Sequence, residues 1–222
     1  MTKADNVFLV DICGTIFHSN TTMDFMRFYF GKTSWFHMVD SLLQYRIVGF
    51  LNARVFSIFH IDIIRSYCIT HLRGYSSIEL EQMAKKFYEV FLFKRLNPSV
   101  IRIMERRREK GEKLVLVSAT LDFIAKEVAK QLDISTYFSS QLSFNNGICK
   151  GQLSVDLLDG KLEILRQNNL LGSFSGVITD NYTDVDIIKV SKTAYLIQYQ
   201  NRKNKWSSIV NLNDSKYIMV VL

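Results

Sequence analysis

The sequence is short of the features that mark several protein classes. It has one proline and no stretch rich in glycine and serine, so neither a flexible linker nor a low-complexity region divides its 222 residues. Its three cysteines, Cys13, Cys68 and Cys149, lie far apart and form no CxxC pair. That spacing argues against a disulfide framework and a zinc site, and it favours a reducing compartment.

Long uninterrupted apolar runs are also missing. The most apolar region, residues 35–64, contains Asp40, Arg46, Arg54 and Asp62, and a transmembrane helix tolerates few such charges. The first residues are polar and run straight into an expected strand, unlike a signal peptide. We therefore expect no transmembrane segment and a cytoplasmic location.

Charge is plentiful and unevenly signed. The 28 lysines and arginines outnumber the 21 acidic residues and give a formal net charge of +7. This excess favours anionic ligands such as phosphate esters, nucleic acid or acidic membranes, and a solvated basic surface explains it equally well. The most basic run, residues 102–113, also contains Glu105, Glu109 and Glu112. It is typical of a charged helix face, so we expect no nucleic-acid partner.

Short runs of β-branched and aliphatic residues predict buried parallel strands. These runs are residues 7–10, 114–117, 176–179, 194–197 and 218–222. Helical segments alternate with them: Asn97-Pro98 is typical of a helix start, Gly111 of a helix end, and the apolar spacing in 122–132 predicts another helix. The alternation predicts an α/β protein with a Rossmann-like, doubly wound parallel sheet.

Two segments interrupt this alternation. Residues 17–96 predict helices throughout, are too long for a loop, and hold 17 of the 28 aromatic residues. We expect an inserted all-helical cap here, with most of its aromatics packed inside it, and a core domain made of residues 1–16 and 97–222. The second segment, 143–155, contains Asn146-Gly147 and predicts a β-hairpin.

Polar residues follow three of the predicted strands. Asp11 follows the first, Ser118 the second and Asp180 the third. Ligands of doubly wound sheets bind beyond the carboxyl ends of the strands, so these side chains are expected to converge. Lys161 precedes the third strand at the expected start of a helix. Each residue alone is more often a cap, turn or surface residue, and the four in this order are a far more specific signal.

This combination resembles the haloacid dehalogenase superfamily, in its phosphoserine-phosphatase-like branch with a helical cap. The first family motif, Asp-x-Asp-Gly-Thr after a strand, matches residues 11–15 except at Cys13. The second motif matches at Ser118, and the family lysine matches Lys161. The last motif, which has Gly-Asp-Ser and a second aspartate a few positions later, keeps both aspartates in residues 179–184 and loses the glycine and the serine.

The resemblance implies a phosphomonoester phosphatase that acts on a small phosphorylated substrate through an aspartyl-phosphate. Asp11 would attack phosphorus, splitting one displacement into two easier ones. Lys161 would place a fixed positive charge against Asp11 and the transferring group. The residues at the phosphate would be Gly14, Thr15, Ser118 and Ala119, the last through its amide.

The resemblance also implies a magnesium cofactor. Its ligands would be Asp11, the backbone carbonyl of Cys13, and Asp180, while Asp184 would orient metal-bound water. Magnesium prefers oxygen ligands and keeps several waters. It would offset the repulsion between a carboxylate and a phosphate dianion.

The departure at Cys13 concerns proton transfer. The family has its general acid and base, an aspartate, at this position, and general acid–base catalysis contributes roughly 10²- to 10⁴-fold. Three hypotheses stay open. The chain is a slow or selective phosphatase, or it performs another phosphoryl or phosphonyl chemistry of the superfamily, or it is a catalytically weakened protein that binds a phosphorylated ligand or a protein partner.

The cap is expected to choose the substrate, which the sequence does not identify. Arg27, Arg46, Arg54 and Arg65 could meet an acidic substrate, although each such residue is more often a surface residue. The aromatic content suits either an apolar leaving group or docking of the cap on a membrane surface or a protein. Cap aromatics clustered toward Asp11 would indicate the first role, and an exposed apolar patch on the outside of the cap the second.

Overall fold

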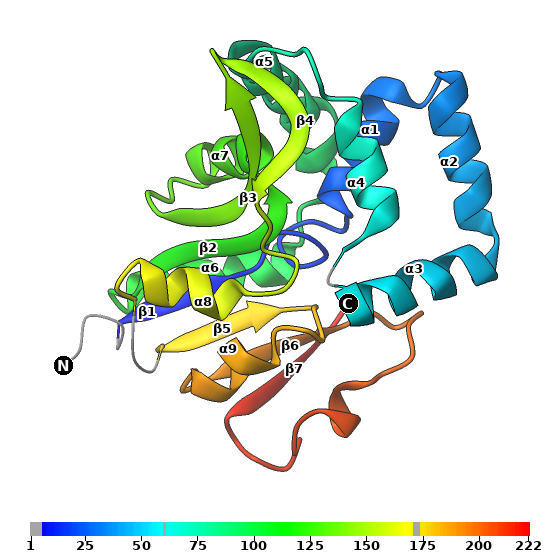
Figure 1. Ribbon diagram of the computed structural model, residues 1–222. Helices are drawn as coiled ribbons and strands as arrows, with labels where there is room; N and C mark the ends of the chain where they lie inside the picture. The colour runs from blue at the N-terminus through cyan, green and yellow to red at the C-terminus, as the bar shows by residue number, and fades with distance from the viewer. Residues whose placement is uncertain (1–5, 60, 171–173) are drawn as a thin grey trace.

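The computed structural model describes residues 6–59, 61–170 and 174–222 (Figure 1). Its strands are β1 (Val7–Val10), β2 (Lys113–Leu121), β3 (Tyr137–Asn145), β4 (Ile148–Val155), β5 (Gly176–Thr179), β6 (Ala194–Gln198) and β7 (Tyr217–Val221). They form one sheet in the order β4-β3-β2-β1-β5-β6-β7. Every neighbouring pair is parallel except β3 and β4. The predicted α/β class with a mostly parallel sheet is confirmed.

The helices lie on both sides of this sheet (Figure 1). They are α1 (Thr21–Phe30), α2 (Ser34–Gln44), α3 (Arg46–Phe59), α4 (Ile63–Thr70), α5 (Ser77–Phe87), α6 (Pro98–Glu109), α7 (Asp122–Gln131), α8 (Lys161–Gln167) and α9 (Val185–Val190). Side chains alternate along β1, so Phe8 and Val10 pack in one apolar cluster with α6 and α7. Val7 and Leu9 pack in a second cluster with α8 and α9. This two-sided packing is that of a doubly wound sheet.

Strand β2 is longer than predicted. The prediction ended at residue 117 and placed Ser118 after the strand, whereas β2 continues to Leu121 with a register shift between Ser118 and Leu121. The prediction was wrong because polar residues interrupt the aliphatic run. Their hydroxyls are satisfied inside the strand, since the Oγ of Ser118 lies 3.1 Å from the Oγ1 of Thr120.

The predicted hairpin is present, and it belongs to the main sheet. Asn146 and Gly147 adopt the positive φ angles, 48° and 77°, of a tight turn between β3 and β4. Strand β3, however, starts at Tyr137 and pairs in parallel with β2, so it is no separate insert. The first half of β3 was not predicted as a strand because it contains serines. One of them, Ser140, is nevertheless buried and accepts a hydrogen bond from the N–H of Leu157.

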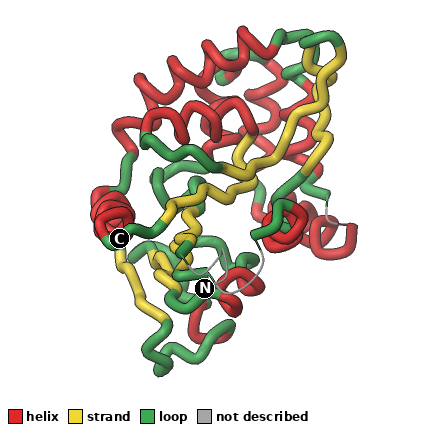
Figure 2. Tube along the Cα trace, turned by 90° about the vertical axis from the view of Figure 1, so that its left-hand side faces the viewer, coloured by secondary structure: helices red, strands yellow, loops and turns green. Residues whose placement is uncertain are grey.

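The segment between residues 17 and 96 is helical, as predicted. Helices α1 to α5 are followed by a π-helical turn, Tyr88–Leu92, and a 3₁₀ turn, Phe93–Arg95. Figure 2 shows several helices in the upper part of the molecule, with the long hairpin beside them. Among the described residues, no helix combines the length and apolar character that crossing a bilayer requires.

The helical segment leaves and re-enters the sheet at one point. Phe17 and Leu96 form an antiparallel bridge, and the N–H of Asn97 donates to the carbonyl of Ile16. Asn97 also reaches the carbonyl of Thr15 with its side-chain amide, so the start of α6 holds the loop after β1. The domain limits at residues 16/17 and 96/97 stay a prediction.

Aromatic packing ties part of the helical segment to the sheet layer. Phe25 of α1 contacts Phe87 of α5 and Phe123 of α7, with ring centroids 5.4 and 5.0 Å apart. Phe91 stacks on Phe87 at 5.0 Å. Many cap aromatics therefore form packed core. Helices α2 and α3, by contrast, lie at the outer edge of the molecule (Figure 1).

Gly151 allows β4 to approach α4 closely, and its replacement should be costly. A Cβ there would stand 2.7 Å from the carbonyl oxygen of Thr70 and 2.9 Å from the Cβ of Arg73, and φ is +68°. We expect Gly151→Ala to lose about 1–2 kcal/mol to left-handed backbone and a further 1–3 kcal/mol, roughly, to overpacking. Urea unfolding measures the loss.

Gly147→Ala is the matched control, because Gly147 has φ +77° and open space around its Cα. Only the backbone part of the loss should appear there. Equal losses in the two variants would contradict the close packing of β4 on α4.

Candidate active site

Asp11 lies at the carboxyl end of β1, held by the main chain. Its N–H donates to the carbonyl of Ile178 in β5 at 3.1 Å, and its side chain is buried. The following loop turns back through Gly14, whose φ is +68°. A Cβ on Gly14 would overlap the carboxylate of Asp180. The glycine of the first motif therefore lets the carboxylates of Asp11 and Asp180 share one site.

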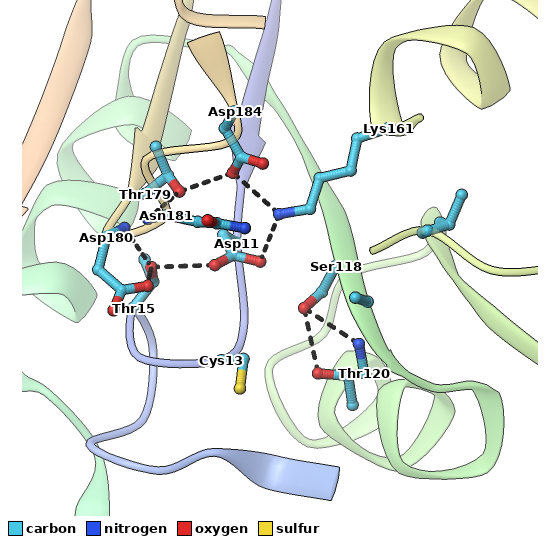
Figure 3. Close-up of polar contacts among 12 residues, drawn as sticks. Asp11, Cys13, Thr15, Ser118, Thr120, Lys161, Thr179, Asp180, Asn181 and Asp184 are labelled. Atoms are coloured by element: carbon cyan, nitrogen blue, oxygen red, sulfur yellow. Dashed lines mark hydrogen bonds and ion pairs between the residues drawn. The ribbon is translucent and has the colours of Figure 1, made fainter. Parts of the chain in front are cut away.

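Lys161 joins two carboxylates from different elements (Figure 3). It is the first residue of α8 and is buried, and its Nζ lies 3.0 Å from Asp11 Oδ1 and 2.8 Å from Asp184 Oδ2. The hydroxyl of Thr179 donates to the same Asp184 oxygen at 2.7 Å. Burial alone would lower the pKa of Lys161, but the two carboxylates outweigh it and raise the pKa. The ammonium stays charged.

Asp180 and Thr15 complete the acidic side of the site. The N–H of Asp180 donates to Thr15 Oγ1 at 3.0 Å. The single Thr15 hydroxyl proton can go to Asp11 Oδ2 at 3.3 Å or to Asp180 Oδ1 at 3.4 Å. Burial, with the charge of Asp11, raises the pKa of Asp180 to about 7. Burial also raises the pKa of Asp11, against the opposing effect of Lys161. The two carboxylates thus carry more negative charge than their surroundings neutralise.

Ser118 faces the same site from β2, supported by residues that the sequence did not single out. Its hydroxyl contacts Thr120, whose own hydroxyl lies 2.8 Å from that of Thr21 in α1. Thr120 belongs to the Ser-Ala-Thr run that continues the second motif, so its position beside Ser118 was a usable signal. These hydroxyl contacts connect the phosphate-binding region expected at Ser118 and Ala119 to α1, the first helix of the cap.

Arg65 of α4 reaches the same region from the cap. One of its nitrogens donates to the carbonyl of Ala119 at 2.8 Å, and another binds both carboxylate oxygens of Asp156 at 2.8 and 2.7 Å. It is buried and lines the cavity, contrary to the usual surface position of such residues. Arg27 lines the cavity while paired with Asp24 and Asp40.

Only one of the other two candidate arginines of the cap has a described side chain. Arg54 lies exposed on α3. The side chain of Arg46 is outside the described residues. Of the three candidate arginines whose side chains are described, two border the cavity.

The thiol of Cys13 forms hydrogen bonds with the backbone around it. Its Sγ donates to the carbonyl of Ser19 at 3.3 Å and accepts from the N–H of Thr21 at 3.3 Å. Burial, and after it the charge of Asp11, raises the pKa of Cys13 to about 12. The thiol therefore stays protonated at neutral pH and connects the loop after β1 to the start of α1.

A cavity of about 730 Å³ opens onto these groups. The predicted site residues that line it are Asp11, Cys13, Gly14, Ser118, Ala119, Lys161 and Asp180. Thr15 and Asp184 are buried behind this wall and join the site through the contacts described above. All nine predicted site residues are thus brought together at the carboxyl edge of the sheet.

Two further residues of the cavity wall were not predicted. The hydroxyl of Tyr199 donates to the carbonyl of Gly14 at 2.6 Å. Arg202 lies over the Tyr199 ring and 3.4 Å from Asp180 Oδ2. Tyr199 directly follows β6, so the same strand-end rule that found Asp11 could have found it. Arg202 lies in an irregular segment and gave no signal.

The donor atoms at Asp11 and Asp180 are of the kind that magnesium prefers. Two carboxylates and the nearby backbone of Cys13 offer hard oxygens, and their mutual repulsion favours a cation. In the described part of the chain, no three His, Cys, Asp or Glu side chains gather as a metal-binding group. A magnesium ion keeps several waters, so a site with two side-chain ligands still fits it.

Comparison with known proteins gives this site a context. No curated protein matches the chain. Among solved structures, a protein of unknown function from Bordetella pertussis Tohama I is 15% identical, with a TM-score of 0.75 over 97% of this chain and 99% of that one. A substrate-bound phosphoserine phosphatase is 12% identical, with a TM-score of 0.63 over 98% and 93% of the two chains.

A phosphoserine phosphatase from T. onnurineus is 19% identical, with a TM-score of 0.57 over 92% of this chain and 89% of that one. At these identities the likeness shows a shared fold. A family model described as haloacid dehalogenase-like hydrolase matches residues 8–189, which include the first, second and last motifs and Lys161. The chain belongs to the haloacid dehalogenase-like hydrolase family.

Proposed function

We propose that the chain is a magnesium-dependent phosphomonoester phosphatase that acts through an aspartyl-phosphate on Asp11. The observation that carries the proposal is the buried Lys161 ammonium in contact with both Asp11 and Asp184, at the wall of a cavity. A fixed cation there keeps Asp11 oriented and presents positive charge where negative charge develops in the transition state.

The reaction would proceed in two steps. In the first, an oxygen of Asp11 forms a bond to phosphorus while the bond between phosphorus and the ester oxygen breaks. The Ser118 hydroxyl and the Ala119 amide would bind phosphoryl oxygens. In the second step, water attacks phosphorus, the bond to Asp11 breaks, and inorganic phosphate leaves. The carboxylate of Asp11 is then restored.

Magnesium would be held by Asp11, Asp180 and the backbone carbonyl of Cys13. When bound, it would neutralise negative charge on the carboxylates and the phosphoryl group. Asp184 contacts Lys161 and Thr179, so it also positions the lysine. That contact gives Asp184 a role besides the orientation of metal-bound water.

Cys13 limits which substrates would react well. A protonated thiol with a pKa of about 12 releases its proton too reluctantly to serve as a general acid or base near neutral pH. An alkoxide leaving group would have to take its proton from water. Esters with acidic leaving groups, such as aryl phosphates, need no such proton and should be preferred.

The same thiol supports a second candidate function. A chain without a proton donor at position 13 could bind a phosphorylated ligand and turn it over too slowly to matter. The site would then be a recognition site with the same contacts at Ser118, Ala119 and Lys161. The Cys13→Asp variant separates the two candidates. A phosphatase already shows turnover with Cys13, whereas a recognition protein should show turnover only once the carboxyl group is introduced.

Asp11→Asn should remove turnover. The amide cannot form the covalent intermediate, so kcat should fall by about 10³-fold or more, as for other covalent nucleophiles. Hydrolysis of p-nitrophenyl phosphate with magnesium and with EDTA measures it. Asp186→Asn is the control, since Asp186 is an exposed carboxylate two residues from Asp184. An active Asp11→Asn would rule out Asp11 as the nucleophile.

Cys13→Asp should raise turnover of alkyl phosphates by up to about 10²-fold, the lower part of the range for general acid–base catalysis. The gain on p-nitrophenyl phosphate should be smaller, because its leaving group needs no proton. Steady-state kinetics on both substrates measure the two gains. An equal gain on both would place the limit at the second step, where a base activates water, and a loss would show that proton transfer is not what Cys13 limits. Turnover in this variant alone would favour the recognition role.

The metal-free protein should lose stability as pH rises from about 4 to about 7. Folding raises the pKa of Asp180 from 3.8 to about 7, so in this window the folded chain holds a proton that the unfolded chain releases. That stabilising proton is lost as pH passes 7. Magnesium should therefore raise Tm more at pH 8 than at pH 5, where it must displace the proton.

Thermal unfolding with magnesium and with EDTA at the two pH values gives this difference without any assay of activity. Asp180→Asn is the control variant, because it removes the titrating group and one metal ligand. In that variant, both the dependence of Tm on pH and the increase of Tm with magnesium should be smaller. A magnesium shift that is equal at both pH values, or unchanged in Asp180→Asn, would place the ion elsewhere.

A further inference from the structure

The outside of the cap carries an unusual density of exposed apolar side chains. Phe50 and Ile47 of α3 are 68% and 66% exposed, and they belong to a larger set. We call this set the outer cap face: Met38, Leu42, Tyr45, Ile47, Phe50, Leu51 and Ile58. Single exposed hydrophobic residues are normal on proteins, but a gathered set marks an interaction site.

The spacing of these residues puts them on one side of α3. Ile47, Phe50, Leu51 and Ile58 recur at intervals of three, four and seven, which is the periodicity of one helix face. Met38 and Leu42 of α2, and Tyr45 directly after it, are spaced in the same way. Both helices lie at the outer edge of the molecule (Figure 1).

The face does not serve the substrate cavity. The tyrosines that line the cavity, Tyr182 and Tyr199, come from the α/β core, whereas Phe50 and Tyr45 point to solvent. Other cap aromatics, such as Phe25 and Phe87, are packed inside. Of the two roles that the aromatic content of the cap suggests, an exposed patch on its outside indicates docking.

The charge around the face selects the partner. The sequence has two arginines, Arg46 and Arg54, and no acidic residue from 41 to 61. Asp40, the acidic residue of α2, is paired with Arg27 at 2.8 Å. Arg54 is exposed and falls in the same arc of α3 as Phe50. An apolar helix face with arginine and no acidic residue matches an anionic lipid surface, where the apolar side chains enter the headgroup layer and the guanidinium reaches phosphate.

A second copy of the chain is a poorer occupant. It would bring the same basic α3 surface to the contact, and the two chains, each with a net charge of +7, would repel one another. We propose that the outer cap face docks on the surface of an anionic bilayer with α3 lying in the plane of the headgroups. Helix α3 has 14 residues, fewer than the roughly 20 that span a bilayer, which suits this interfacial position.

Docking of this kind would bring the cavity to the membrane. Leu43 of α2 and Asn52 of α3 line the same cavity as Asp11, so the helices that meet lipid also form one side of the site. The proposal itself does not rest on the phosphatase chemistry. Binding to lipid and hydrolysis are measured separately and can fail separately.

Co-sedimentation with vesicles tests the docking. The purified chain should bind vesicles of equal parts phosphatidylcholine and phosphatidylglycerol, bind phosphatidylcholine alone far less, and lose affinity as salt screens the charge. Phe50→Ser should weaken binding to the anionic vesicles by about tenfold or more, from the lost burial of one aromatic side chain. Phe93→Ser is the matched control, because Phe93 is 61% exposed and outside this face.

Several results would overturn the proposal. Binding that ignores lipid charge, binding unchanged in Phe50→Ser, and no binding at all each do so. Sedimentation that shows a dimer broken by Phe50→Ser would assign the face to a second copy instead. Leu51→Ser, at a 55% exposed position of the same face, serves as a second variant if Phe50→Ser fails to fold.

Discussion

Burying the Lys161 ammonium costs several kcal/mol of solvation, and the carboxylates of Asp11 and Asp184 are what offset it. These three side chains come from the end of β1, the start of α8 and the residue before α9. Each is placed by the sheet: Asp11 by its bond to β5, and Asp184 by Thr179 at the end of β5. The contact exists only when the strands are in register, so the site and the fold form together.

The same cluster leaves an excess of negative charge. One lysine faces the carboxylates of Asp11, Asp184 and Asp180, and the exposed Arg202 reaches Asp180 only at 3.4 Å. Burial first, and then the charge of Asp11, raises the pKa of Asp180. Buried carboxylates with too few cationic partners destabilise a purely structural cluster. They favour the binding of a cation, because the cation neutralises the charge that a proton would otherwise neutralise.

Some strands could be predicted from the sequence and others could not, depending on which residues they contain. Strands β1 and β5 were predicted to the residue, because their aliphatic side chains are buried on both faces. The ends of β2 and the start of β3 were missed because serines stand in them, and a buried serine looks polar until its hydrogen-bond partner is known.

The site followed the same rule. Asp11 and Asp180 were predictable because strand ends meet at one edge of the sheet. Lys161 was identified from its place at a helix start, and Ser118 from a strand that proved longer than predicted. Arg65 was only one of four candidate arginines, since its burial depends on Asp156, which lies 91 residues further along the chain. No local pattern contains that pair. The sequence predicted an exposed apolar patch on the cap only as one of two alternatives. Apolar residues on a helix do not reveal which of its sides other elements will cover.

Cys13 shows how one substitution can keep a loop while changing its chemistry. Its thiol joins the carbonyl of Ser19 and the N–H of Thr21, so the loop after β1 stays attached to the start of α1. The surroundings that hold the thiol protonated, burial and the charges of Asp11 and Asp180, would act on any acid at this position. A carboxyl group there would have its pKa raised for the same reasons, which is what a general acid near neutral pH requires. The environment for acid catalysis is therefore present around residue 13, and the side chain that could use it is not.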